Sequence, residues 1–231
     1  ENFYIAPKIN VVYEDIEVDA ESTTDVKKMA GTFVNADLGY SLTVDKRNQR
    51  FKPTSGYITS FNQKLPLLQD SSSITNGINM SSYKAFSEDV VASLKFNAQA
   101  VNGTDGDVRL TNRLFIPRNK LRGFLTKQVG PKDGEDFVGG NYVSALNLEG
   151  QLPNLLPESY KTDFNVFLDA GDIWSIDYSD TLNDSNKFRS SIGIGANVFT
   201  PVGPLSWTFT QNISKAATDE TETMNFRIGT S

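Results

Sequence analysis

The chain has 231 residues and a formal net charge of −6, from 22 Lys and Arg against 28 Asp and Glu. It contains no cysteine and no histidine, which excludes disulfides, zinc sites built on Cys or His, and Ser-His-Asp or Cys-His catalytic groups. The acidic balance argues against a general nucleic-acid binder, which normally carries a basic patch.

Hydrophobic residues make up 38% of the chain. No stretch approaches the roughly 18–20 consecutive apolar residues that a membrane-spanning helix requires, so a helical membrane protein is excluded. A transmembrane β-barrel is compatible with this composition, because only one face of each of its strands meets lipid.

The chain opens directly on a strand-like segment. Residues 1–5, Glu-Asn-Phe-Tyr-Ile, do not have the pattern of a signal peptide, so we expect the start to be a cut inside a longer protein. From residue 32 onward, apolar and polar residues alternate with a period of two. The apolar members of the first long example are Val34, Ala36, Leu38, Tyr40, Leu42 and Val44. Successive side chains of a strand point to opposite faces, so this segment is an apolar wall backed by a polar one.

The same alternation recurs along the chain and predicts about ten strands. They lie near residues 3–18, 32–46, 56–68, 77–88, 90–101, 141–152, 162–175, 188–200, 204–214 and 222–231. Strands of this kind exceed the roughly 5–6 residues typical of globular proteins and reach the roughly 9–11 residues that a tilted strand needs to cross a bilayer.

The connections between these strands alternate in length. Residues 87–89 and 200–204 form short turns, whereas residues 109–140 and 176–187 form long polar loops. Short turns at one end and long loops at the other are typical of outer-membrane barrels. A soluble β-sandwich also shows alternation, but strand length and turn asymmetry favour an all-β fold of the antiparallel transmembrane β-barrel type.

Several motifs follow one another in a recognisable order. The long connection contains Leu121-Arg122-Gly123-Phe124 and then Gly130-Pro131-Lys132. Downstream come Leu-Asn-Leu-Glu at 146–149, Phe-Leu-Asp-Ala-Gly-Asp-Ile-Trp at 167–174, Ser-Ile-Gly-Ile-Gly at 191–195 and Thr-Pro-Val-Gly-Pro-Leu at 200–205. Upstream lies an Asp-x-Arg-Asn…Pro-x-x-Gly turn made by Asp45, Arg47, Asn48, Pro53 and Gly56. An Arg-Gly-Phe tripeptide alone is a weak signal, but together these motifs resemble the BamA family of POTRA-barrel surface antigens over nearly the whole chain.

The resemblance implies a domain assignment. Residues 1–231 are expected to be the C-terminal part of an outer-membrane β-barrel domain, namely strands seven to sixteen of a sixteen-stranded barrel. The long loop, at about 109–140, is expected to fold into the lumen, and POTRA domains are expected upstream.

Arg122, Glu149 and Asp169 form the candidate site. The alternation places both carboxylates on the inward face of neighbouring strands, where they need a cation or water, and an arginine fork can engage carboxylates through paired hydrogen bonds. The resemblance implies that the loop brings Arg122 near both acids. It also implies that Gly123 permits a tight backbone and that Phe124 packs against the inner wall. The alternative is a pair of solvated lumen acids and an exposed loop arginine.

The resemblance further implies an assembly factor, not an enzyme, that folds and inserts other β-barrel proteins into the bacterial outer membrane. Its first and last strands would pair weakly, so that the seam opens and templates an incoming strand by β-augmentation. The expected seam strand contains Phe226, Ile228 and Gly229, and a glycine contributes no side chain there.

The expected partners are outer-membrane lipids and lipopolysaccharide, unfolded β-barrel client proteins, and accessory lipoproteins of the assembly complex. No nucleic acid, cofactor or metal is expected. Two other functions remain open on the sequence. One is a relative that exports polypeptides, of the two-partner secretion or translocation-assembly type, which the number of upstream POTRA repeats would distinguish. The other is a passive diffusion porin, which would lack the loop motif and its two acids.

Overall fold

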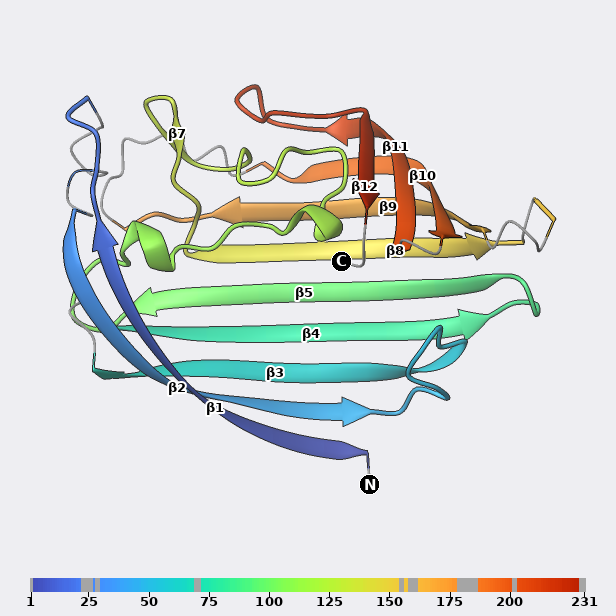
Figure 1. Ribbon diagram of the computed structural model, residues 1–231, viewed down its shortest axis with the longest axis horizontal. Helices are drawn as coiled ribbons and strands as arrows, with labels where there is room; N and C mark the ends of the chain where they lie inside the picture. Colours follow the sequence, from blue (N-terminus) through green and yellow to red (C-terminus); the bar gives the residue numbers. More distant parts are fainter. Residues whose placement is uncertain are drawn as a thin grey trace.

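The computed structural model describes residues 2–21, 27, 30–68, 72–153, 156–157, 162–177, 187–200 and 203–228. Ten strands in these ranges form one antiparallel sheet, in which each strand pairs with the next along the chain. They are β1 (Phe3–Ile16), β2 (Gly31–Asp45), β3 (Ser55–Leu68), β4 (Ser73–Ala85), β5 (Val91–Gly103), β8 (Tyr142–Leu152), β9 (Thr162–Trp174), β10 (Arg189–Thr200), β11 (Gly203–Ser214) and β12 (Met224–Ile228). The sheet is a curved wall with β1 and β12 at its edges (Figure 1).

The predicted all-β fold and its antiparallel strands are confirmed, with shifts at some strand ends. The strand predicted at 77–88 begins earlier, at Ser73, and ends at Ala85. The last strand begins at Met224 instead of 222, and residues 229–231 lie outside the described ranges.

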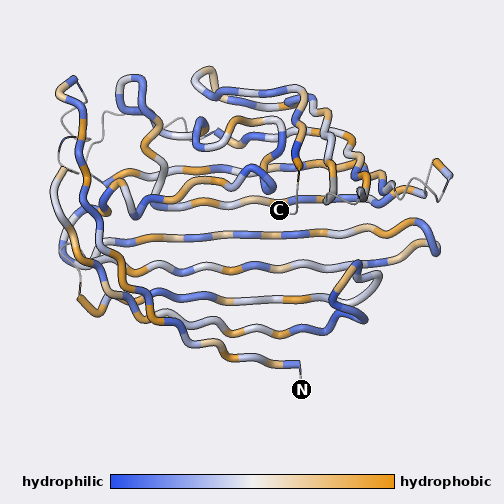
Figure 2. Tube along the Cα trace, in the orientation of Figure 1, coloured by the Kyte–Doolittle hydropathy of each residue, from blue (hydrophilic) through white to orange (hydrophobic). Residues whose placement is uncertain are grey.

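Side-chain direction follows the alternation of the sequence, which Figure 2 shows as hydrophobic and hydrophilic residues taking turns along the strands. The register pairs Leu148 with Leu168 and Asn147 with Asp169, so β8 and β9 share the same two faces. Leu148 is 48% exposed on the outer face, whereas Asp169 is fully buried on the inner face. The outward set on these strands is Leu146, Leu148, Phe164, Val166 and Leu168, and the inward set is Asn147, Glu149, Asn165 and Asp169.

The two ends of the sheet carry different connections. At one end, residues 86–90 join β4 to β5 and residues 201–202 join β10 to β11. At the other end, residues 104–141 join β5 to β8. This long loop holds the 3-10 helices η1 (Leu110–Asn112) and η2 (Arg118–Lys120) and the short strands β6 (Lys132–Asp133) and β7 (Asp136–Phe137). β3 and β4 are an exception, because only four residues separate Leu68 from Ser73 although both lie at the long-loop end. Within the described ranges, no helix is long and apolar enough to cross a membrane.

The five motif residues lie in and beside the turn between β2 and β3: Asp45 ends β2, Arg47, Asn48 and Pro53 lie in the turn, and Gly56 is the second residue of β3. Arg47 donates from Nε and Nη2 to the two carboxylate oxygens of Asp45, at 2.9 and 2.7 Å. These hydrogen bonds lower the pKa of the Asp45 carboxyl to about 2, so the pair stays ionised at neutral pH. Gly56 has φ +90°, and a Cβ there would lie 2.1 Å from the carbonyl oxygen of Lys46, so no other residue fits. The motif therefore builds a rigid turn.

The face assignment predicts opposite outcomes for two substitutions on β5. Phe96 shares the outer face with Leu146, whereas Gln99 points into the lumen beside Gly77. Phe96→Arg should destabilise the barrel by about 2–4 kcal/mol, because a charge facing hydrocarbon loses its hydration. Gln99→Arg should change stability by less than about 1 kcal/mol. Urea unfolding of the full-length protein in phospholipid vesicles measures both, and equal effects would contradict the assignment.

Candidate functional site

The guanidinium of Arg122 lies on the inner face of the sheet and binds acids on two adjacent strands. Its Nε and Nη2 donate to the two carboxylate oxygens of Asp169 at 2.7 and 2.8 Å, and its Nη1 donates to Glu149 Oε2 at 3.0 Å. The backbone N–H of Arg122 also donates to Asp169 Oδ2 at 3.1 Å. The Asp169 side chain is fully buried, whereas those of Arg122 and Glu149 are 17% and 26% exposed. The structure thus brings together the three residues that the sequence singled out.

The electrostatics of this group favour the charged arginine. Burial by itself lowers the pKa of the Arg122 guanidinium, but hydrogen bonds and Coulombic attraction from Asp169, and then from Glu149, outweigh it and raise that pKa. An exposed pair contributes about 0–1 kcal/mol, but removing the partner of a buried charge costs about 3–5 kcal/mol. Asp169 is the buried member, so Arg122 matters most as its counter-charge.

An aromatic ring lies under the guanidinium. The Cζ of Arg122 is 3.5 Å from the ring centroid of Phe167, a buried residue on the inner face of β9. Gly193, the β10 residue paired with Phe167, leaves room for that ring and for the carbonyl oxygen of Phe209, since a Cβ there would lie 2.5 Å from the ring and 2.3 Å from that oxygen. A cation–π contact of this kind contributes about 0.5–2 kcal/mol. The sequence placed Phe167 on the inner face but predicted no role for it. The inward-facing Gly193 was the signal that a large side chain could lie on the neighbouring strand.

Polar side chains of the wall hold the loop backbone. Asn147 Nδ2 donates to the carbonyl oxygen of Lys120 and to Asp169 Oδ1, both at 2.8 Å. The hydroxyl of Ser191 donates to the carbonyl oxygen of Arg122. The wall therefore holds the loop backbone at two carbonyl oxygens, those of Lys120 and Arg122.

The next two motif residues seat the loop on the wall. Gly123 has φ +87°, and a Cβ there would lie 3.0 Å from Thr210 Cβ, so the glycine permits close approach to β11. Phe124 is 2% exposed and belongs to the buried apolar cluster that joins loop and wall. The other members are Ile116, Leu121, Val129, Val143, Ala145 and Ile173.

The loop also contacts the connection between β11 and β12, which the sequence did not predict. Arg118 donates from Nε to Glu222 Oε1 at 2.8 Å and from Nη2 to the second carboxylate oxygen. Phe124 forms a backbone bridge with Thr221, and the N–H of Glu222 donates to the carbonyl oxygen of Gly123 at 3.1 Å. No local pattern signals these contacts, because their partners lie about 100 residues apart.

The expected seam strand begins late. Phe226 and Ile228 lie on β12 opposite Trp207 and Leu205, and within the described residues, which stop at Ile228, β12 pairs with β11 over five residues. Gly229 lies outside the described residues. Met224, the first residue of β12, lies opposite Phe209, five residues before the end of β11.

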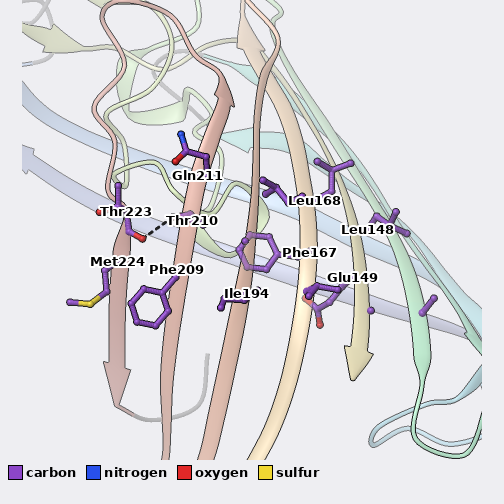
Figure 3. Close-up of a pocket in the computed structure, with 15 residues that line it drawn as sticks. Leu148, Glu149, Phe167, Leu168, Ile194, Phe209, Thr210, Gln211, Thr223 and Met224 are labelled. Atoms are coloured by element: carbon purple, nitrogen blue, oxygen red, sulfur yellow. Dashed lines mark hydrogen bonds between the residues drawn. The ribbon is translucent and has the colours of Figure 1, made fainter. Parts of the chain in front are cut away.

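The outer face of the same region carries a shallow apolar groove of about 980 Å³ that extends from β5 to β12. Figure 3 shows its lining, including Leu148, Leu168, Ile194, Phe209 and Met224. The clamp and the groove thus occupy opposite faces of one wall, the inner polar and the outer apolar.

This antiparallel wall, with an apolar outer face and a loop clamped inside it, is that of an outer-membrane β-barrel protein. The domain model of the Omp85 superfamily matches residues 1–231, and the chain belongs to that superfamily.

The chain is similar, in sequence and in structure, to proteins that are named BamA. The outer membrane protein assembly factor BamA of Neorickettsia risticii is 28% identical over 218 residues, which cover 92% of this chain and 29% of that protein. The protein of the same name from Nitratidesulfovibrio vulgaris is 25% identical over 209 residues, covering 85% of this chain and 25% of that protein. The crystal structure of BamA from Haemophilus ducreyi lacking POTRA domains 1–3 superposes with a TM-score of 0.84 at 22% identity, over 97% of this chain and 50% of that one. The chain therefore spans between a quarter and a half of the relatives that it matches.

Two glycine substitutions, one at Gly193 and a control at Gly150, test the packing of Phe167. Gly193→Ala should displace the Phe167 ring and the backbone carbonyl of Phe209, and destabilise the protein by about 1–3 kcal/mol, as overpacking does. It should also make the long loop more sensitive to protease. Gly150→Ala should be nearly neutral, because its Cβ would meet only Val166 at 3.5 Å. Urea unfolding and limited proteolysis of the full-length protein test both, and a neutral Gly193→Ala would refute the packing role.

Proposed function

We propose that this chain is the C-terminal part of the barrel domain of an outer-membrane assembly factor, one that folds and inserts other β-barrel proteins. The observation that carries the proposal is the clamp of Arg122 on Asp169 and Glu149, which holds a loop inside the wall. The same loop pairs with the connection that leads into the edge strand β12. The names of the two curated relatives support the same function.

The mechanism requires no covalent chemistry. An edge strand presents unpaired backbone N–H and C=O groups, to which an incoming strand can add. β12 would supply that edge, and because it begins only at Met224, opposite Phe209, β11 extends five residues beyond it. The clamped loop would keep the lumen side of this edge in a defined position while a client strand pairs.

The proposed partners follow from this mechanism. Unfolded β-barrel proteins are the clients, and outer-membrane lipids and lipopolysaccharide contact the apolar outer face. Accessory lipoproteins of an assembly complex are proposed as further partners.

Substitution of Arg122 tests the proposed role of the clamp. In the full-length protein, Arg122→Ala should lower the outer-membrane level of another β-barrel protein several-fold, because two lumen carboxylates lose their cation and the loop loses its anchor. Arg122→Lys should rescue only partly, since a point charge cannot copy the planar fork. Complementation of a depletion strain provides the measurement.

The control is Lys127→Gln, which removes an exposed positive charge from the same loop. It should leave client levels unchanged. Wild-type client levels with Arg122→Ala, at equal amounts of folded protein, would show that the clamp is dispensable.

A further inference from the structure

A second ion pair, outside the Arg122 clamp, is buried more deeply than the first. Arg189, the first residue of β10, donates from Nε and Nη2 to the two carboxylate oxygens of Asp219 at 2.9 and 3.0 Å. Both side chains are fully buried. The remaining Nη1 donates to Asp172 Oδ1 on β9 at 2.7 Å and to the carbonyl oxygen of Lys187 at 2.8 Å. A bidentate fork between two fully buried charges allows little tolerance in geometry.

Asp219 belongs to the connection between β11 and β12, residues 215–223, and it joins three segments. Besides Arg189 on the wall, it accepts a hydrogen bond from the N–H of Ala216 at 2.6 Å within the connection. It also accepts one from the N–H of Gly130 in the long loop, at 3.4 Å. Its carboxylate is thus where wall, loop and connection meet.

Beyond Asp219, the connection is paired with the long loop through its backbone. The N–H of Leu125 donates to the carbonyl oxygen of Glu220, and the N–H of Glu220 donates to that of Gln128, both at 3.0 Å. The N–H of Glu222 completes the pairing at Gly123. β12 begins just two residues later, at Met224. In Figure 1 the connection lies above the sheet and leads directly down into β12.

We propose that Arg189 and Asp219 are positioning residues that set where the last strand begins, so that the lumen loop and the edge strand β12 are held as one unit. The two clamps then have separate tasks. Arg122 holds the loop to β8 and β9, whereas Arg189 holds the start of the last strand to β9, β10 and that same loop. For the measurements on β12 itself, this proposal is independent of the proposed function; only its consequence for client insertion rests on that function.

Hydrogen exchange of the full-length protein in lipid nanodiscs tests the positioning. Asp219→Asn keeps the side-chain shape and removes the charge that the Arg189 fork binds, while the ion pair of Arg189 with Asp172 remains. Amides in residues 220–228 should then exchange at least about tenfold faster, while those of β8 and β9 keep their rates. Arg189→Lys keeps the charge and loses the fork, and it should accelerate the same amides to a smaller degree. It serves as the readout should Asp219→Asn fail to fold.

Arg113→Lys is the matched control. The side chain of Arg113 is fully buried, like that of Arg189, but Arg113 lies in the long loop. It pairs with Asp177 and with the carbonyl oxygen of Val108, away from the connection. It should leave exchange in 220–228 unchanged. Unchanged exchange in both Asp219→Asn and Arg189→Lys would overturn the proposal, and so would equal acceleration by Arg113→Lys.

Complementation separates this proposal from the proposed function. Faster exchange together with a several-fold loss of client barrels supports both. Faster exchange with normal client levels supports the positioning of β12 and overturns its role in insertion. Unchanged exchange overturns the positioning, whatever the client levels.

Discussion

A carboxylate with no exposed surface cannot stay charged without donors around it, and Asp169 is such a group. It receives the Arg122 fork, the Arg122 backbone N–H and the amide of Asn147. These donors come from β8 and from a loop that leaves the sheet at β5. Satisfying one buried charge therefore requires the correct register of β8 and β9 and the entry of the loop into the lumen. Phe167 and Gly193 serve the same requirement, because they shape the surface on which the guanidinium rests.

The two faces of the wall meet different environments. Its outer face is apolar because no water is present in the hydrocarbon layer to solvate polar groups, and its inner face carries the acids and amides that the loop requires. Three arginines of this region, Arg113, Arg122 and Arg189, each pair with at least one aspartate. Loop and wall are thus joined by charge-assisted hydrogen bonds in addition to the apolar cluster around Phe124, and such bonds fix orientation as well as distance.

The last described strand begins late because the residues before it have other partners. Residues 220–222 pair with the long loop instead of extending the β11–β12 hairpin. The contacts of Glu222 with Arg118 and Gly123 hold the connection on the lumen side, so β12 begins only at Met224. An edge that is anchored at its start has less freedom for accidental pairing, yet its unpaired backbone groups can still accept a strand.

The sequence by itself determined which face each strand residue occupies, because strand alternation has a period of two and depends only on neighbouring residues. That is why Leu148 and Asp169 could be placed on opposite faces without coordinates. It is also why the sequence predicted ten strands whose ends lie within a few residues of those in the structure. The motif resemblance implied that Arg122 lies near Glu149 and Asp169, and the structure has that contact. Only the tertiary structure decided the ring of Phe167 under Arg122, the Arg189–Asp219 pair and the late start of β12. Each of these features joins residues that are roughly 30 to 100 positions apart in the sequence. Such contacts depend on how the loop and the connection pack on the wall, and they produce no repeating pattern along the chain.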